Sequence, residues 1–299
     1  MSLRPVKDVR QSVPTMEGAG VSLRRAFGFG NTSDFDPFLL FDDFRNDNPD
    51  AYLAGFPWHP HRGIETITYV LAGTVEHGDS LGNRGQMGAG DVQWMTAGSG
   101  ILHQEMPKGD PQGRMHGFQL WSNLPSSLKM TKPRYQDIVA ADIPEVTDDD
   151  GTRVRIIIGD FWGQSGPVEG VAAEPRYLDV SVPPGKKKRI AIDRANNAFA
   201  YVFAGSGTFR DASEPQAVAT EIVSGPNDGA FDLVTNRSLV LFDRGDEIVV
   251  QAGDEGIRFL LVSGKPLEEP VAWRGPIVMN SNWELQQAYA ELRAGTFIK

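Results

Sequence analysis

The chain has no cysteine and no long apolar run, and each absence excludes a class of protein. Without cysteine it can form no disulfide, no thiolate metal site and no cysteine nucleophile. No run reaches the ~20 apolar residues that a membrane-spanning helix needs, so we expect no membrane association. Residues 1–18 lack the apolar stretch of a secretory signal, and the lack of disulfides fits a reducing compartment. We therefore expect a cytoplasmic protein.

Basic residues are scarce relative to acidic ones. The chain has 29 lysines and arginines against 39 aspartates and glutamates, a formal net charge of −10 and an isoelectric point of about 5.0. Such a chain repels nucleic acid unless one face is locally basic, so we expect no direct nucleic-acid binding. The basic run at 185–189 (GKKKR) is typical of a solvated hairpin turn, with a contact for an acidic partner as the alternative.

Turn-forming residues are plentiful, and they predict an all-β chain. The sequence holds 33 glycines and 20 prolines, with short runs rich in valine, isoleucine and phenylalanine between them. Only the C-terminus has a helical pattern: Ser281 and Glu284 form a capping box, and Gly295 can end the helix. Apolar residues recur there at helical spacing, at Leu285, Ala288, Tyr289 and Leu292.

Two tripeptides hold three of the five histidines: His59-Pro60-His61 and His103-Gln104-Glu105. In a β-strand, residues i and i+2 point to the same face, so each tripeptide can direct two ligands one way. If the two strands lie together in a small barrel, three imidazoles and one carboxylate converge. Imidazole suits Fe, Ni, Cu or Zn, and the carboxylate favours Fe(II) or Mn(II). The alternative is two unconnected pairs on the surface or in the core.

The sequence also repeats itself. Residues 68–73 (TYVLAG) parallel 200–205 (AYVFAG), and Gly90-Asp91 with Ala97-Gly98 parallels Gly245-Asp246 with Ala252-Gly253. Glycines at such turns supply positive φ or close backbone approach, so their recurrence predicts one barrel built twice. We expect domains at 1–136 and 153–299, joined by a linker at 137–152.

The second copy lacks the histidines. By the repeat, the four candidate ligand positions correspond to Ala191, Asp193, Phe259 and Leu261. We therefore expect a second barrel without a metal, serving as a structural or partner-binding half.

The segments 59–73 and 90–107 resemble the two cupin motifs in the form typical of the pirin family. The resemblance extends through 36–44, 118–138 and 275–297, and so covers nearly the whole chain. It implies a bicupin: two antiparallel jelly-roll β-barrels packed face to face, with a short C-terminal helix. It also implies one divalent transition metal in the N-terminal barrel. Fe(II) is favoured, with Mn, Ni, Cu and Zn open. Carried onto this sequence, the ligands are His59, His61, His103 and Glu105.

Some positions stay ambiguous. In the general cupin pattern the glutamate of the first motif, here Glu65, is a ligand, whereas in pirins the later glutamate takes that role. A supporting role for Glu65 stays open, although an exterior or core-edge carboxylate is favoured. We expect His77 to be solvated, and pocket lining by His116 stays open. Among the others, we expect a solvated strand end at Asp42 and Asp43, and barrel-core positions at Trp94 and Trp121.

The resemblance implies two classes of function. The first is a dioxygenase that opens flavonols such as quercetin, using O2, a small aromatic substrate and Glu105 as general base. The second is a non-enzymatic, iron-dependent protein: a redox-sensing transcriptional cofactor or a modulator of a metabolic enzyme, with a protein partner. A zinc or nickel isomerase of the cupin type is a weaker third class. No residue separates the first two, because fold alone does not fix function.

Overall fold

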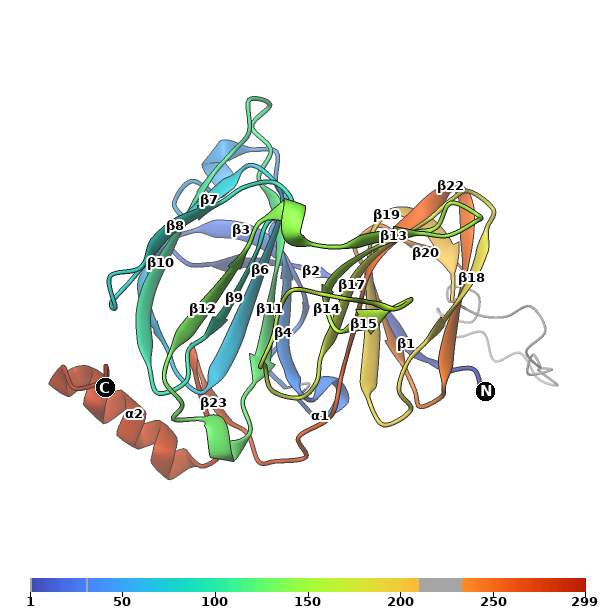
Figure 1. Ribbon diagram of the computed structural model, residues 1–299. Helices are drawn as coiled ribbons and strands as arrows, with labels where there is room; N and C mark the ends of the chain where they lie inside the picture. The colour runs from blue at the N-terminus through green and yellow to red at the C-terminus, as the bar shows by residue number, and fades with distance from the viewer. Residues whose placement is uncertain (1, 31, 210–232) are drawn as a thin grey trace, which may run out of the picture. The chain divides into compact units, whose positions relative to one another are not determined.

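The computed structural model describes residues 2–30, 32–209 and 233–299, and it is built almost entirely of β-strands (Figure 1). The all-β prediction is therefore confirmed. The chain divides into two compact units. We call the first the histidine unit; it comprises Ser12–Ile143, Pro167–Glu174 and Lys265–Lys299. We call the second the apolar unit; it comprises Met1–Gln11, Pro144–Gly166 and Pro175–Gly264.

Each unit contains a terminal segment that lies at the far end of the chain from most of its residues. The units therefore differ from the contiguous domains expected at 1–136 and 153–299. Strand β1 (Val6–Gln11) pairs with β21 (Ser238–Phe242) in the apolar unit. At the other end, Lys265–Lys299 returns to the histidine unit. The segment expected to be a linker holds a strand as well. Its β13 (Glu145–Thr147) pairs with β14 (Arg153–Ile158).

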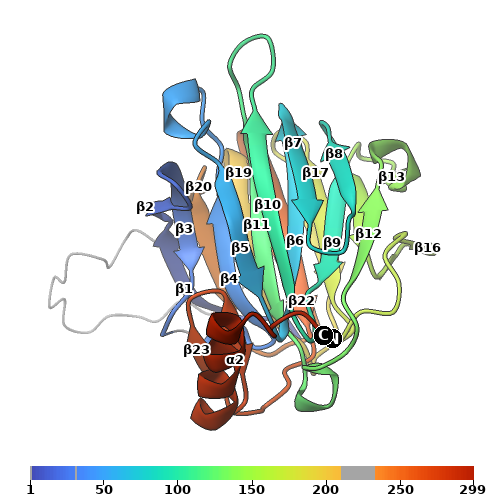
Figure 2. The ribbon, with the colours of Figure 1, turned by 90° about the vertical axis from the view of Figure 1, so that its left-hand side faces the viewer.

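Two antiparallel sheets form the histidine unit. The first has seven strands in the order β12-β9-β6-β11-β4-β3-β2, and the second has four in the order β5-β10-β7-β8 (Figure 2). Their bounds are β2 Val13–Glu17, β3 Val21–Phe27, β4 Phe38–Asp43, β5 Phe56–His61, β6 Ile64–Ala72, β7 Thr74–Asp79, β8 Arg84–Met87, β9 Val92–Thr96, β10 Ile101–Lys108, β11 His116–Asn123 and β12 Arg134–Ile138. Short helical turns lie at α1 Thr32–Phe35, η1 Pro49–Ala51, η2 Ser126–Leu128 and η3 Ala140–Asp142.

One row of side chains across the seven-stranded sheet is polar throughout. Its members are direct cross-strand neighbours, and directly opposed residues share a face. They run in the order Arg25, Asp42, Gln119, Thr68, Gln93 and Asp137. We call this set the polar row. On the same sheet, apolar residues such as Leu39, Ile64 and Met95 are fully or almost fully buried. The polar row therefore crosses a face that is otherwise core.

The apolar unit is one nine-stranded sheet. Its main order is β1-β21-β19-β22-β17-β14-β13, with β18 on β22 and β20 on β19. The remaining bounds are β17 Arg176–Val182, β18 Lys187–Ala191, β19 Asn197–Thr208, β20 Val234–Thr235 and β22 Glu247–Gly264, with a separate hairpin of β15 Asp160–Phe161 and β16 Gln164–Ser165. Phe259 and Leu261 lie in its core, as the repeat predicted. On β18, however, Ile190 faces the core and Ala191 is exposed. The alignment of the two repeats is therefore out by one residue on this strand, and a shift of one residue exchanges the two faces of a strand.

The C-terminal segment forms a hairpin and the predicted helix. The hairpin joins β23 (Ala272–Arg274) to β24 (Ile277–Met279), and α2 spans Asn282–Ala294 (Figure 2). The Ser281 hydroxyl accepts from the Glu284 amide at 3.2 Å, and Gly295 ends the helix at φ 72°. Leu285 and Ala288 are buried. In the part of the chain that the structure describes, no helix is long and apolar enough to cross a membrane.

Candidate metal centre

Three of the four predicted ligands come together. His59 and His103 are direct cross-strand neighbours on β5 and β10, and His61 lies two residues further along β5. Their ligand nitrogens all lie within 4.8 Å of one another. Among residues 2–30, 32–209 and 233–299, this is the only group of three or more such side chains arranged to hold a metal. The i, i+2 argument from sequence thus placed the three imidazoles on one face.

The hydrogen bonds of these histidines leave nitrogen lone pairs free for a cation. The His59 Nδ1–H donates to the Pro57 carbonyl at 2.8 Å, and the His61 Nδ1–H donates to the Pro276 carbonyl at 3.2 Å. Both Nε2 atoms are then unprotonated, yet they lie 3.1 Å apart. Two lone pairs facing each other repel unless a cation lies between them. Both ring nitrogens of buried His103 lack a hydrogen-bond partner in the described chain. The donor set therefore fits a divalent transition metal.

Burial also favours the neutral imidazoles that metals require. It lowers the pKa of His59, and it lowers the pKa of His61 and His103 well below the ordinary value for histidine. For His61 and His103, the neighbouring imidazoles lower it further, because two like charges at this range repel. The three rings therefore stay neutral at physiological pH.

Glu105 is not a member of the three-histidine group. The pairing of β10 with β5 shifts register between His103 and Glu105, so Glu105 lies opposite Phe56. Its Oε1 lies 3.1 Å from the Thr68 hydroxyl. Burial raises the pKa of Glu105 to about 7, and the Thr68 hydrogen bond opposes that rise. Its role as the fourth ligand stays a prediction.

A cavity of about 480 Å³ opens beside this group, with His59, His61 and Glu105 in its wall. Most of the lining is apolar, including Leu40, Phe44, Phe56 and Trp58. Trp121 belongs to the lining as well, and its ring meets His61 edge-on at 5.1 Å. Trp121 is thus partly buried: it packs against the core and also lines the cavity, whereas Trp94 is fully buried as expected. Pockets of this size and lining usually bind small organic molecules.

His77 is not solvated, contrary to expectation. It is 6 % exposed and lies directly across from Glu105 on β7. Its Nε2 lies 2.9 Å from the Gln93 amide nitrogen, and its ring stacks on Tyr135 at 5.7 Å. The turn-rich sequence hid a strand whose alternate residues face the barrel interior.

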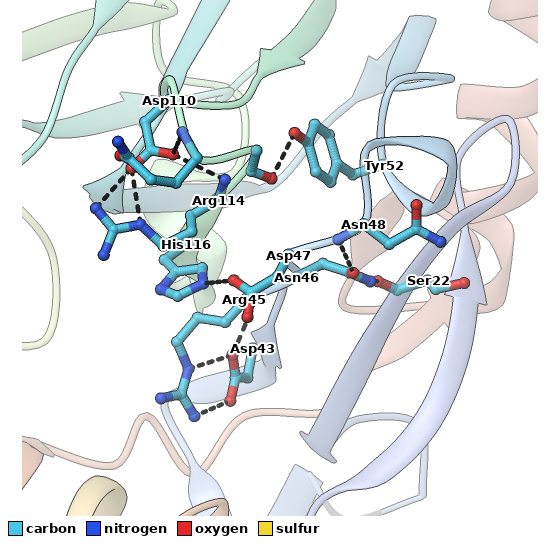
Figure 3. Close-up of polar contacts among 12 residues, drawn as sticks. Ser22, Asp43, Arg45, Asn46, Asp47, Asn48, Tyr52, Asp110, Arg114 and His116 are labelled. Atoms are coloured by element: carbon cyan, nitrogen blue, oxygen red, sulfur yellow. Dashed lines mark hydrogen bonds and ion pairs between the residues drawn. The ribbon is translucent and has the colours of Figure 1, made fainter.

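His116 does not line the cavity. Its Nε2 lies 2.6 Å from Asp47 Oδ1, in the cluster of polar contacts shown in Figure 3. In the same view, Asp43 binds the guanidinium of Arg45, with Nε to Oδ1 at 2.8 Å. Asp43 is therefore buried and paired, and so is Asp42, which binds Arg25. The expectation of a solvated strand end was wrong, because both faces of β4 are covered.

Glu65 is a core-edge carboxylate, as favoured from sequence. It is 1 % exposed, and its Oε1 accepts from the Thr96 hydroxyl at 2.7 Å. It is not among the residues lining the cavity. Burial raises its pKa to about 7, against the hydrogen bonds it accepts.

The C-terminal segment holds the loop that follows His61 in place. The sequence analysis did not predict these contacts. Besides the Pro276 carbonyl on His61, buried Arg62 donates to Ser99 and Phe297 carbonyls at 2.7 and 2.8 Å and binds Glu291 at 2.8 Å. Lys129 adds bonds to the Gly63 and Val278 carbonyls, at 2.8 and 2.9 Å. A carbonyl on the non-ligating nitrogen fixes the tautomer and ring orientation of a metal-binding histidine. The bonds from His61 to Pro276 and from Arg62 to Glu291 and Phe297 join residues more than two hundred positions apart, so no local motif predicts them.

Comparisons with known proteins agree with this geometry. The Pirin family matches residues 20–122, and the Pirin C-terminal cupin domain matches residues 177–298. A pirin-like protein of Caulobacter vibrioides is 41% identical over 298 residues, covering 99% of this chain and 100% of that protein. Human pirin is 39% identical over 279 residues, covering 93% of this chain and 88% of that protein.

A solved structure agrees as well. The crystal structure of a quercetin 2,3-dioxygenase from Acinetobacter baumannii superposes with a TM-score of 0.85 at 29% identity. It covers 99% of this chain and 98% of that one. The full-length resemblance noted in the sequence is thus confirmed, and the chain belongs to the pirin family, with the two-cupin fold of that family.

Proposed function

We propose that this chain is an iron-dependent dioxygenase that opens flavonols such as quercetin. The observation that carries the proposal is the position of His59 and His61, two members of the three-histidine group, in the wall of a 480 Å³ cavity lined mainly by apolar and aromatic side chains. A flat aromatic substrate fits such a lining, and the histidines provide a polar reacting end. The similarity to the Acinetobacter enzyme named as a quercetin 2,3-dioxygenase supports the substrate class.

His59, His61 and His103 would hold the ion, and Glu105 would complete the set. The bound ion supplies Lewis acidity and redox capacity to a substrate and O2. Glu105 Oε1 faces the Thr68 hydroxyl, which leaves Oε2 to accept the hydroxyl proton of a flavonol. Thr68 also lies 2.7 Å from Gln119 Oε1, so its single hydrogen bridges to one acceptor at a time. The apolar wall excludes water from the reacting centre.

The test is O2 uptake with quercetin, expressed per bound metal, beside an equal concentration of free iron. We expect Glu105→Gln to lower turnover by roughly 10²–10⁴, the scale of a lost general base, and by more than its metal occupancy explains. Glu76→Gln is the matched control, because Glu76 is exposed on the neighbouring strand β7. Full activity in Glu105→Gln would remove Glu105 as the base while keeping the enzyme.

Wild-type uptake no faster than free iron would end the dioxygenase proposal. The non-enzymatic class, an iron-dependent cofactor or modulator of a protein partner, would then be the favoured function. In that case the same variants would change partner binding and not O2 uptake.

A further inference from the structure

A hydrogen-bond donor and an acceptor lie side by side in the cavity wall, on strands that carry none of the three histidines. Gln119 and Asp42 are direct cross-strand neighbours on β11 and β4, and both line the cavity. Arg25 holds Asp42 in place through two bonds of 2.8 Å, one to each carboxylate oxygen. A carboxylate offers about four lone-pair positions, so Asp42 can accept further hydrogen bonds.

The side-chain oxygen of Gln119 fixes the orientation of its amide group. Its Oε1 accepts from the Thr68 hydroxyl at 2.7 Å. In the part of the chain that the structure describes, its amide nitrogen has no protein hydrogen-bond partner, although it carries two N–H groups. The wall therefore presents a free donor beside a fixed acceptor. A hydroxyl group is the simplest ligand group that can satisfy both, since it accepts one hydrogen bond and donates another.

The apolar lining around Gln119 and Asp42 lets this pair distinguish ligands with a hydroxyl from ligands without one. Leu40, Phe44 and Trp121 line the same cavity, and most of its wall is apolar carbon. A site built to bond a hydroxyl rejects analogues that lack it, because its own polar groups then stay unpaired. Asp42 lies two strand spacings, about 10 Å, from Thr68, which contacts Glu105. The bonded hydroxyl therefore lies farther along the polar row from Glu105 than Thr68 does.

We propose that Gln119 and Asp42 are specificity residues that recognise a ring hydroxyl of a planar aromatic ligand. The Gln119 Nε2–H donates to the hydroxyl oxygen, and the hydroxyl donates to an Asp42 oxygen. The ligand class rests on the proposed function. Within that class, the pair selects flavonols with additional ring hydroxyls over the parent flavonol without them.

Binding without oxygen tests this independently of turnover. Quercetin and the parent flavonol, whose rings carry no further hydroxyls, are titrated into metal-loaded protein under anaerobic conditions, with tryptophan fluorescence as the readout. Gln119→Met keeps the side-chain length and removes the amide. We expect it to weaken quercetin binding roughly 10-fold to 100-fold, the range for a lost hydrogen bond in an apolar site, and to leave the parent flavonol within about twofold.

Gln86→Met is the matched control, since Gln86 is exposed on β8 and outside the cavity lining. It should change neither affinity. If Gln119→Met fails to fold, the proposal can be tested by changing the ligand instead of the protein. A quercetin methylated on its ring hydroxyls should bind wild type more weakly by a similar factor.

The outcomes separate the two proposals. Tighter binding of quercetin than of the parent flavonol, lost in Gln119→Met, supports the specificity pair even if neither ligand is turned over. In that event only the dioxygenase proposal fails. A preference for quercetin that persists in Gln119→Met, an equal loss for both ligands, or no preference in wild type would overturn the pair even if turnover is observed.

Discussion

The two units build comparable rows of cross-strand neighbours from opposite kinds of side chain. In the apolar unit, Val154, Val180, Phe259 and Val202 follow one another across four strands, and all are fully buried. In the histidine unit, the polar row defined above crosses six strands. An antiparallel sheet accepts either row, because its backbone pairing does not depend on the side chains. The framework is thus shared, and the side chains of one face decide whether it becomes a core or a binding cavity.

The two rows are stabilised differently. Burying each large apolar side chain contributes about 1.5–3 kcal/mol without any directional requirement. A buried polar side chain costs free energy unless it is hydrogen-bonded, so each member of the polar row must find a partner. Arg25 with Asp42, Thr68 with Gln119, and Gln93 with Asp137 are such pairs. The apolar unit therefore tolerates changes of shape poorly, and the histidine unit tolerates changes of polarity poorly.

The largest effect should follow from breaking the histidine group. We predict one metal ion per chain, and we expect His61→Ala to lose it. A metal that binds only the folded state stabilises it by about 1.4 kcal/mol per tenfold excess over Kd, so wild type should gain thermal stability from metal and the variant should not. Elemental analysis and melting curves with and without metal measure both effects.

His116→Ala is the matched control, because His116 binds Asp47 and lies outside the group. It should keep its metal. Wild-type metal content in His61→Ala would refute the ligand assignment. Two ions per chain, with the second near Phe259, would refute the contrast between the units.

The next effect concerns the row of apolar neighbours in the apolar unit, to which Phe259 belongs. Phe259→Ala should destabilise the protein by about 3–5 kcal/mol, because it opens a cavity among fully buried side chains. Phe259→Leu, which fills most of that volume, should cost about 1 kcal/mol. Denaturant unfolding measures both values. Metal content per folded chain should not change, and a loss of metal in Phe259→Ala would show that the units are not independent in this respect.

Sequence reasoning reached the histidine group and α2 because both depend on local spacing. The i, i+2 rule places His59 and His61 on one face of a strand, and the capping box at Ser281 sets the start of the helix. The bond from His61 to Pro276 joins positions far apart in the chain, so no such rule reaches it.

The misjudged residues share one cause. Asp42 and His77 read as solvated because charged and turn-forming residues surround them in sequence. Their burial depends on which strands flank β4 and β7, and that register is set by the whole sheet. The specificity pair is hidden for the same reason, since Gln119 and Asp42 meet only through the pairing of β11 with β4.

A smaller effect is expected where the C-terminal segment braces the histidine unit. Arg62→Lys keeps the charge but cannot span the Ser99 carbonyl, the Phe297 carbonyl and Glu291 together. Leaving buried acceptors unpaired should cost about 2–3 kcal/mol. We expect faster amide hydrogen exchange in α2. Arg293→Lys, on the exposed face of α2, is the control and should change little. Unaltered exchange in Arg62→Lys would show that the packing of Leu285 and Ala288 alone holds α2.

The last effect concerns a buried carboxyl group without an arginine partner, although several buried carboxyl groups in both units have one. In the apolar unit, Asp179 binds Arg258 at 2.6 Å and Glu247 binds Arg189 at 2.7 Å. In the described residues of the histidine unit, Glu65 is buried without an ion pair within 4.0 Å, and burial raises its pKa from 4.5 to about 7. The folded state therefore holds a proton on Glu65 more tightly than the unfolded state does.

The sign of the pH dependence follows from that difference. Below pH 4.5 Glu65 is protonated in both states and costs nothing. As the pH rises from 4.5 to 7, the unfolded state loses this proton first, so stability falls by about 3 kcal/mol and then levels off. Glu65→Gln, which mimics the protonated form, should match wild type near pH 4.5 and exceed it by that amount at pH 8. Denaturant unfolding across this range measures the difference, with exposed Glu76→Gln as control. Parallel curves for wild type and Glu65→Gln would mean that folding does not raise the pKa of Glu65.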